Sequence, residues 1–295
     1  MDACIRKAVF PIAGLGTRFL PVTKASPKEM LPVVDKPLIQ YAVEEAYAAG
    51  IRQMIFVTVR TKRAVEDHFD TAYELETELE VAAKYDLLSL VRSIKPDDMT
   101  CTYVRQPRAL GLGHAVLCAE HLINEEPFAV LLADDLMTGS VPVLKQMVDQ
   151  FNEKHVSLIA VESIPKAHTR RYGVIVGPEF EDILIDIKQI VEKPESHLAP
   201  STLGVVGRYI FTPSIFRCIA EQSRGVGNEI QLTDAIAKLM QKERVFGYRF
   251  MGTRYDCGDK LGLMQAMVDF SASHSEIGRD FTHWLNKREK ISHHA

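Results

Sequence analysis

Two glycines and a group of cationic side chains stand close together near the N-terminus, in the stretch AGLGTRFLPVTKASPKEMLP of residues 13–32. Glycines let a ligand approach the backbone closely, and free backbone N–H groups in such a loop can bind an anion. Arg18 adds a planar set of donors suited to phosphate oxygens, and Lys24 and Lys28 follow it. Three cations behind one glycine loop favour a polyphosphate ligand over a single phosphate.

The glycine loop matches neither of the two common phosphate-binding motifs. A dinucleotide-binding fingerprint would have a third glycine where Phe19 stands. A P-loop would have its second glycine at the same place, five residues after Gly14, followed by Lys and then Ser or Thr. Taken alone, the two glycines favour an ordinary turn between a strand and a helix with solvated basic residues. Other motifs must decide between these interpretations.

Carboxylates follow an apolar, strand-like run at LLADDL, where Asp134 and Asp135 stand. Ligands of α/β sheets bind at the C-terminal ends of parallel strands, and Mg²⁺ commonly takes one or two carboxylates together with substrate phosphates and waters. The pattern therefore indicates a candidate metal site. Asp256 lies in YDCGD before a helical pattern, where a turn or a helix-capping role is the alternative.

The elements that must position these residues alternate between strands and helices. IRKAVFPIAG predicts a buried first strand, KPLIQYAVEEAYAAG a helix that ends at Gly50, and IRQMIFVTV a second buried strand. Strand, helix, strand is the start of a parallel α/β sheet. The alternation then predicts strands at about 101–105, 127–136, 156–164 and 244–252, and helices at about 112–123, 141–154, 213–221 and 231–241.

Three regions depart from this alternation. Residues 70–95 are acidic and favour helix, which predicts a helical insertion on the surface. Residues of about 165–212 contain short β-branched runs, which predict a smaller β-rich region laid over the parallel sheet. Helices at about 259–290 close the chain. Because no repeat or linker is present, we predict one α/β domain over residues 1–295, with a Rossmann-like, mixed, mostly parallel central sheet flanked by helices.

Composition narrows the class of protein. The 295 residues are 46% hydrophobic and 25% charged, which is ordinary for a soluble enzyme, and the net charge of −4 argues against a nucleic-acid partner. No apolar run reaches the roughly 18–20 residues of a membrane span, and the N-terminus lacks a signal-peptide pattern. We therefore expect a cytoplasmic protein with no membrane partner. The scattered cysteines predict neither a disulfide framework nor a zinc site: Cys4, Cys101, Cys118, Cys218 and Cys257.

The stretch of residues 13–32 resembles the sugar-phosphate nucleotidyltransferases, also called sugar-nucleotide pyrophosphorylases. In that family a G-x-G-T-R…P-K motif follows the first strand in the same way. More narrowly, GLGTRFLPVTKASPKEMLPVVDKPLIQY is similar to the version in the bacterial UTP–glucose-1-phosphate uridylyltransferases. The resemblance continues through DHFDTAYELE, QPRALGLGHAV, YGVI, VEKP, EIQLTDAI and YDCGDK. It implies condensation of UTP and glucose 1-phosphate to UDP-glucose and pyrophosphate, with Mg²⁺ as cofactor and a homodimer or homotetramer as the assembly.

The resemblance also implies roles for single residues. Arg18, Lys28 and Lys193 would be catalytic. Gln106 would read the uracil edge, for which an amide that both donates and accepts is suited. Asp134 and Asp256 would hold the metal, and Asp135 would be an adjacent support. The resemblance leaves open whether Asp135 also binds the metal. The remaining nucleotide-binding positions would be Ala13, Gly14, Gly16, Thr17 and Gly111, and the sugar-binding positions Gly173, Glu192 and Lys193.

Alternatives stay open at this point. Outside the family pattern, Gln106 is an ordinary surface polar residue, and Glu192 with Lys193 is an ordinary surface pair. His114 is better explained by a structural hydrogen bond than by contact with phosphate. A thymidylyltransferase that uses dTTP is the alternative enzyme, since uracil and thymine differ by one methyl group. A non-catalytic sugar-nucleotide-binding subunit is the alternative class, although it would be expected to lose the charged site residues that this chain retains.

Overall fold

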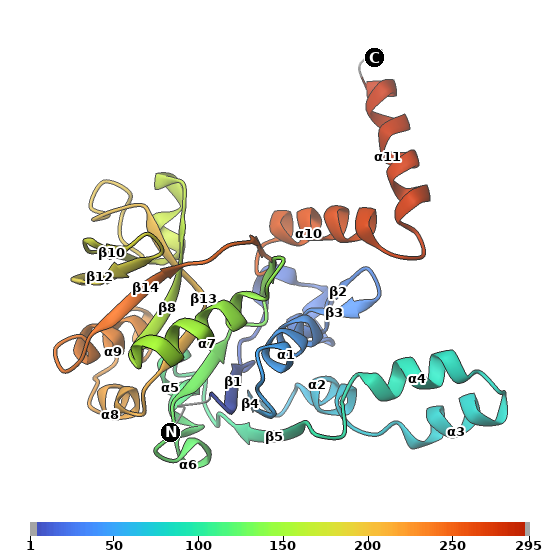
Figure 1. Cartoon of the computed structure of the whole chain (residues 1–295), viewed down its shortest axis with the longest axis horizontal. Coiled ribbons are helices and arrows are strands. Elements are labelled where there is room, and N and C mark those ends of the chain that lie inside the picture. Colours follow the sequence, from blue (N-terminus) through green and yellow to red (C-terminus); the bar gives the residue numbers. More distant parts are fainter. Residues whose placement is uncertain (1–4, 293–295) are drawn as a thin grey trace.

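One large sheet runs through the computed structural model, which describes residues 5–292 (Figure 1). Four parallel strands form one end of the sheet in the spatial order β5 (Thr100–Arg105), β4 (Gln53–Thr58), β1 (Lys7–Pro11) and β6 (Phe128–Leu131). Next comes β13 (Leu203–Phe211), which is antiparallel to both of its neighbours, β6 and β8 (Ser157–Ser163). The sheet is completed by β14 (Val245–Arg249), which is parallel to β8, and by β11 (Leu184–Asp186) and β10 (Glu179–Glu181). The predicted fold class, a mixed and mostly parallel sheet, is confirmed.

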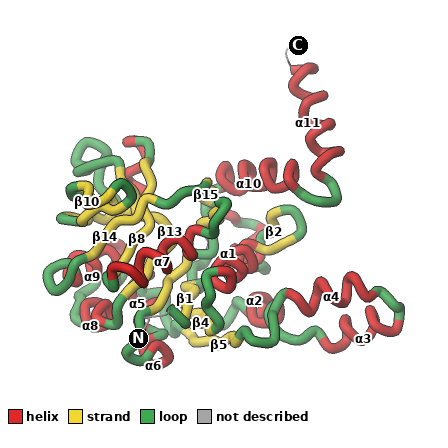
Figure 2. The backbone as a smooth tube through the Cα atoms, viewed as in Figure 1, coloured by secondary structure: helices red, strands yellow, loops and turns green. Residues whose placement is uncertain are grey.

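Helices cover both faces of this sheet (Figure 2). The strand KAVFP is buried along nearly its whole length because its side chains alternate between two apolar clusters. Ala8 and Phe10 join the cluster under α1 (Leu38–Ala48) and α7 (Val143–Lys154), whereas Val9 joins the cluster under the opposite helices. Burial on both faces explains the continuous apolar runs of the sequence. The opposite helices are α5 (Leu112–Leu117), α6 (Glu120–Ile123), α8 (Ser214–Ala220) and α9 (Leu232–Leu239).

The helix predicted at 112–123 is divided in two. The backbone N–H of Ala119 donates to the carbonyl of Val116, three residues back, so the chain tightens between α5 and α6. The α1 helix ends as predicted, with Gly50 at a φ of +96° two residues after Ala48. A shorter helix, α2 (Arg63–His68), follows β4.

Residues 70–95 contain two helices, α3 (Tyr73–Val81) and α4 (Tyr85–Ser93), which extend away from the sheet as a hairpin (Figure 1). The C-terminal helices α10 (Lys260–Ser273) and α11 (Gly278–Ser292) also extend away from the sheet, above α3 and α4 in the view of Figure 1. In the region predicted to be β-rich, β9 (Gly173–Val176) pairs antiparallel with β12 (Gln189–Glu192) and with the start of β13, as a branch of the large sheet. No helix among the described residues is long and apolar enough to cross a membrane.

Two small sheets were not predicted. The strands β2 (Pro32–Val33) and β3 (Lys36–Pro37) form one of them. In the other, β7 (Asp135–Thr138) pairs antiparallel with β15 (Thr253–Asp256), in a register that sets Asp135 opposite Asp256. The sequence TRYD of β15 has no apolar run, and we expected the helices to follow β14 directly. Four cysteines are free thiols, Cys101, Cys118, Cys218 and Cys257, and Cys4 lies outside the described residues.

A buried ion pair supports the turn that carries the predicted metal ligand. The side chain of Arg208 is fully buried, and its Nη2 lies 2.7 Å from Oε2 of Glu45. Its guanidinium also donates to the backbone carbonyls of Leu132 (3.0 Å), Asp135 (2.8 Å) and Gly207 (2.9 Å). One side chain from β13 and one from α1 therefore fix the backbone of residues 132–135.

Replacement of this arginine should destabilise the fold strongly. Arg208→Leu leaves the Glu45 carboxylate buried without its cation, so the free energy of unfolding should fall by about 3–5 kcal/mol. Urea unfolding followed by circular dichroism measures this change. Arg249→Leu is the matched control, because Arg249 pairs with Glu179 on the exposed surface, and its loss should cost at most about 1 kcal/mol. Equal losses in the two variants would contradict the structural role of Arg208.

Candidate active site

The C-terminal ends of the four parallel strands bring the predicted residues to one edge of the sheet. β1 leads into the glycine loop, β5 into Gln106, and β6 into the turn that carries Asp134. The backbone N–H of Gln106 donates to the carbonyl of Thr58 at the end of β4, at 2.9 Å. Positions about 120 residues apart in sequence therefore line one site.

The site consists of two adjoining cavities that meet at Asp134. The first, of about 440 Å³, is lined by Lys28 and by all the predicted nucleotide-binding positions: Ala13, Gly14, Gly16, Thr17, Gln106 and Gly111. The second, of about 260 Å³, is lined by all the predicted sugar-binding positions, Gly173, Glu192 and Lys193, together with Arg18 and Asp256. Both cavities share Leu112, Leu132, Asp134 and Glu229. The arrangement offers two ligand spaces with a carboxylate between them.

Asp134 is paired with Lys28 across this junction. The Nζ atom of Lys28 lies 2.5 Å from Oδ2 of Asp134. Burial opposes the charged form of Asp134, but Lys28, a backbone hydrogen bond and Arg18 together outweigh it and lower the pKa of the carboxyl. For Lys28 too, burial disfavours the charge, while Asp134 and then Glu29 raise its pKa above the ordinary value. Both groups are charged at neutral pH.

Asp256 approaches Asp134 from β15 on the other side of the junction. Its Oδ2 accepts from Nη2 of Arg171 at 2.6 Å and from the hydroxyl of Tyr172 at 2.9 Å. A Cβ atom on Gly258 would lie 2.8 Å from Oδ2 of Asp134 and 3.1 Å from Oδ1 of Asp256. The glycine therefore leaves a small space on which both carboxylates converge.

This space suits a divalent cation. Two carboxylates with room for phosphate oxygens and waters match the preference of Mg²⁺. Among residues 5–292 no group of three or more His, Cys, Asp or Glu side chains could hold a metal, so the remaining ligands would have to come from substrate and water. Arg18 lies beside this space, where its Nη1 donates to the carbonyl of Gly258 at 3.1 Å. It lines the sugar-side cavity, not the nucleotide-side cavity in which Lys28 lies.

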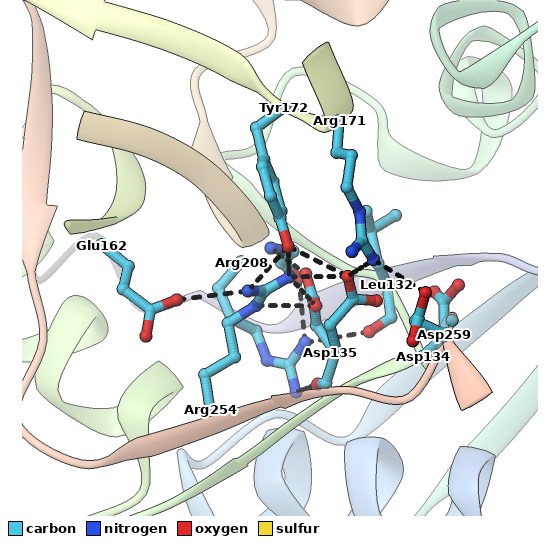
Figure 3. Close-up of polar contacts among 12 residues, drawn as sticks. Leu132, Asp134, Asp135, Glu162, Arg171, Tyr172, Arg208, Arg254 and Asp259 are labelled. Carbon is cyan, nitrogen blue, oxygen red and sulfur yellow. Dashed lines mark hydrogen bonds and ion pairs between the residues drawn. The ribbon is translucent and has the colours of Figure 1, made fainter. Parts of the chain in front are cut away.

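Asp135 is held by the protein through both of its carboxylate oxygens. Its Oδ1 accepts from Nε of Arg254 at 2.7 Å, and its Oδ2 accepts from the backbone N–H of Gly207 at 2.6 Å. Arg254 is itself buried and lies 3.2 Å from Glu162 (Figure 3). Asp135 is thus held between Arg254 and Gly207, whereas Oδ2 of Asp134 and Oδ1 of Asp256 face the space beside Gly258.

The sugar-side cavity is lined by a chain of polar contacts. Oε2 of Glu192 accepts from the hydroxyl of Thr233 at 2.9 Å, and Oε1 lies 3.0 Å from Nζ of Lys193. A Cβ atom on Gly173 would lie 2.7 Å from Cγ2 of Thr233, so a glycine is required there. Lys193 has a φ of +44°, a conformation that costs a non-glycine residue of order 1–3 kcal/mol and that clusters at functional sites.

Gln106 is buried at the end of the nucleotide-side cavity. Its Nε2 lies 3.1 Å from the carbonyl oxygen of Gly111 and 2.9 Å from Nδ1 of His114. The expected structural hydrogen bond of His114 is therefore present. Both N–H groups of Gln106 therefore have acceptors within the protein, Gly111 and His114.

Sequence reasoning missed several residues around the site. Arg171, Tyr172 and Arg254 surround Asp256 and Asp135 (Figure 3). A buried pair, Glu29 and Lys62, lies beside Lys28, with 2.5 Å between Oε2 and Nζ. Burial raises the pKa of Glu29 and lowers that of Lys62. The residue type of Glu29, an acid between Lys28 and an apolar run, was the only signal in the sequence. Cys257 is a core residue as expected, and burial raises the pKa of its thiol to about 12.

Comparisons with known proteins agree with this geometry. The nucleotidyl transferase family matches residues 7–273. The UTP–glucose-1-phosphate uridylyltransferase of Bacillus subtilis (strain 168) is 50% identical over 292 residues, which cover 97% of this chain and 99% of the relative.

Two solved structures with ligands are also similar. A UDP-glucose pyrophosphorylase complexed with UDP-glucose is 47% identical over 92% of this chain and all of the other, with a TM-score of 0.85. A UTP-bound UDP-glucose pyrophosphorylase from Acinetobacter baumannii is 43% identical over 95% of this chain and 98% of the other, with a TM-score of 0.88. The chain therefore belongs to the nucleotidyl transferase family and, within it, to the bacterial UTP–glucose-1-phosphate uridylyltransferases.

Proposed function

We propose that this chain condenses UTP and α-D-glucose 1-phosphate to UDP-glucose and pyrophosphate. The observation that carries the proposal is the pair of cavities that meet at Asp134, one lined by the glycine loop and Gln106, the other by Glu192 and Lys193. Solved relatives bind UTP and UDP-glucose, which are a substrate and a product of this reaction. The retained charges at Arg18, Lys28 and Lys193 oppose a non-catalytic subunit.

The reaction needs charge neutralisation more than proton transfer. The sugar phosphate is already mostly dianionic at neutral pH, since the second pKa of a phosphate monoester is near 6. One of its oxygens attacks the α-phosphorus of UTP in line, the bond from that phosphorus to the bridging oxygen breaks, and pyrophosphate leaves with the negative charge. The obstacle is the repulsion between two polyanions, so positioning and fixed cations are the main catalytic contributions.

We propose that the two cavities divide these tasks. The glycine loop and Lys28 bind the UTP phosphates, and Gln106 with Gly111 reads the base. On the other side Glu192 accepts from glucose hydroxyls, and Lys193 neutralises the sugar phosphate. Arg18 lies in the sugar-side cavity beside Asp134 and Asp256, a position from which it can stabilise charge where the two substrates meet.

We propose Mg²⁺ as the cofactor, held by Asp134 and Asp256 together with substrate phosphates. A bound Mg²⁺ would neutralise charge on the nucleotide phosphates and the departing pyrophosphate. The protein's own part is to hold both carboxylates toward one space, which Lys28 and Arg171 do through their contacts of 2.5 Å with Asp134 and 2.6 Å with Asp256.

We further propose that residues 1–295 act as one nucleotidyltransferase domain, in the cytoplasm, as a homodimer or homotetramer. Two pairs of helices, α3–α4 and α10–α11, project from the body of the protein (Figure 1). Support for association comes from apolar side chains that are exposed on these helices. Their exposed fractions reach 81% at Val81 and 66% at Leu261. Surface of this kind favours contact with another protein chain.

A pyrophosphate-release assay tests the function. With glucose 1-phosphate and Mg²⁺, we expect the highest kcat/KM for UTP among UTP, dTTP, CTP and ATP. Because a pocket separates uracil from thymine by only roughly 1–3 kcal/mol, dTTP should follow at roughly 10- to 200-fold lower kcat/KM. A higher kcat/KM with dTTP would make the chain a thymidylyltransferase, and no turnover with any nucleotide would reject the enzymatic proposal.

A further inference from the structure

The amide of Gln106 has only one orientation that its surroundings permit. The carbonyl oxygen of Gly111 lies 3.1 Å from Nε2 and can only accept a hydrogen bond. If the amide were turned over, its own oxygen would face that carbonyl oxygen, and two acceptors would repel. The nitrogen must therefore face Gly111.

Gly111 is held firmly in this place. It has a φ of +99°, and a Cβ atom there would lie 2.8 Å from Cβ of Glu229 and 2.9 Å from the carbonyl oxygen of Ile230. The backbone on either side is tied to the same segment, because Ile230 N–H donates to Leu110 and Gly113 N–H donates to Ile230, at 2.7 and 2.9 Å. The carbonyl that orients Gln106 is thus a fixed feature of the fold.

The second N–H of Gln106 is taken by His114. Its Nδ1 lies 2.9 Å from Nε2 of Gln106 and 3.8 Å from Sγ of Cys118. An amide N–H facing a ring nitrogen requires that nitrogen to carry a lone pair, so the ring is neutral with its proton on Nε2. Burial, and then the charge of Arg224, lower the pKa of His114 and favour this neutral form.

Because both N–H groups of Gln106 bind protein atoms, its Oε1 is the atom that is available to a ligand. Within residues 5–292 this oxygen has no hydrogen-bond partner, and Gln106 lines the nucleotide-side cavity. We propose that His114 is the residue that, with Gly111, fixes Gln106 as an acceptor-only reader, so that the site selects bases with a ring N–H. Uracil and thymine carry such a group at N3, whereas cytosine has a lone pair there.

The inference rests on the proposed function and assigns His114 a positioning role. His114 does not contact the base. It accepts the second N–H of Gln106, so that Gln106 cannot present this N–H to the ligand. Cytosine is then disfavoured because the lone pair on its N3 faces the lone pairs on Oε1 of Gln106. For bases of equal dimensions this repulsion discriminates more strongly than the size of the pocket. The position of the histidine on α5, one turn before Cys118, keeps its Nδ1 beside the amide.

Two variants of His114 test the proposal. In His114→Asn the side-chain oxygen can take the place of Nδ1 as acceptor, whereas His114→Leu supplies no acceptor. Calorimetric binding of UTP, dTTP and CTP is measured for the wild type and both variants. In His114→Leu we expect the Kd of UTP and dTTP to rise together by about 10-fold, with little change for CTP. In His114→Asn all three should stay within about threefold.

Steady-state kinetics separate this role from a general structural one. In His114→Leu the KM for UTP should rise while the KM for glucose 1-phosphate stays within about twofold, because the defect is confined to the base. Equal weakening of UTP, dTTP and CTP, or no rescue by His114→Asn, would overturn the inference. If wild-type protein showed no turnover, the proposed function would fail instead, and the binding series would still decide whether His114 sets the base preference.

Discussion

Asp134→Asn is expected to lower kcat at saturating Mg²⁺ by at least about 100-fold. The substitution keeps the shape of the side chain but removes the charge that faces the space beside Gly258, where Oδ1 of Asp256 also lies. Lewis-acid neutralisation of phosphate charge is worth several kcal/mol, and about 3 kcal/mol corresponds to two decades in rate. A titration of Mn²⁺ followed by electron paramagnetic resonance in the presence of UTP should show the loss of tight binding directly.

Asp259→Asn is the control for this experiment. Asp259 directly follows Gly258, which faces Asp134, and its Oδ2 lies 3.4 Å from Nη2 of Arg171. Its Oδ1, however, accepts from the N–H of Leu261 at the start of α10. An asparagine retains that capping bond, so kcat and Mn²⁺ binding should stay within a few-fold. Wild-type Mn²⁺ binding in Asp134→Asn would reject Asp134 as the ligand. Asp256 and Asp135 would then be the remaining candidate ligands.

That residues distant in the sequence meet in one site could be predicted, because it follows from the direction of the strands. Ala13 and Asp134 each come soon after a buried apolar run, whereas Gln106 follows β5, whose side chains are exposed or half-buried. Parallel strands end at one edge of the sheet, so residues that follow them meet whatever the spacing along the chain. Apolar runs are the strongest signal in a single sequence, and this signal located the strands before Ala13 and Asp134.

The contacts of Asp135 and Asp256 could not be predicted in this way. They depend on β15, a four-residue strand without an apolar run, whose pairing with β7 joins segments more than 110 residues apart. The side chain of Arg254 owes its buried position to that pairing, because Arg254 lies opposite Met137, two residues from Asp135, whose carboxylate it binds. A lone cation between a strand and a helix has no identifiable partner in one sequence.

The orientation of the Gln106 amide could not be predicted from the sequence for a similar reason. A glutamine can donate and accept, and only the surroundings decide which function is left for a ligand. Here the orientation is set by the Gly111 carbonyl, in a loop held by residues 229 and 230, and by His114, eight residues after Gln106. The cavity that a side chain lines is also set by its surroundings: Arg18 belongs to the glycine loop, yet its side chain lines the sugar-side cavity.

Lys28→Ala and Lys193→Ala should separate the two substrates. Lys28 lines the nucleotide-side cavity and Lys193 the sugar-side cavity. Loss of a charge-assisted phosphate contact costs roughly 1.5–3 kcal/mol, or about one to two decades in affinity. The Kd of glucose 1-phosphate should therefore rise about 10- to 100-fold in Lys193→Ala with little change for UTP, and Lys28→Ala should show the reverse.

The measurement must be direct binding, because both phosphates meet in the transition state and kcat can fall in either variant. Calorimetry would titrate UTP into the free protein, and glucose 1-phosphate into the complex with an unreactive UTP analogue. Lys24→Ala is the matched control for Lys28, since Lys24 belongs to the same segment but lines neither cavity. It should leave both affinities within about twofold. If Lys193→Ala weakened UTP and spared glucose 1-phosphate, the assignment of the two cavities would have to be reversed.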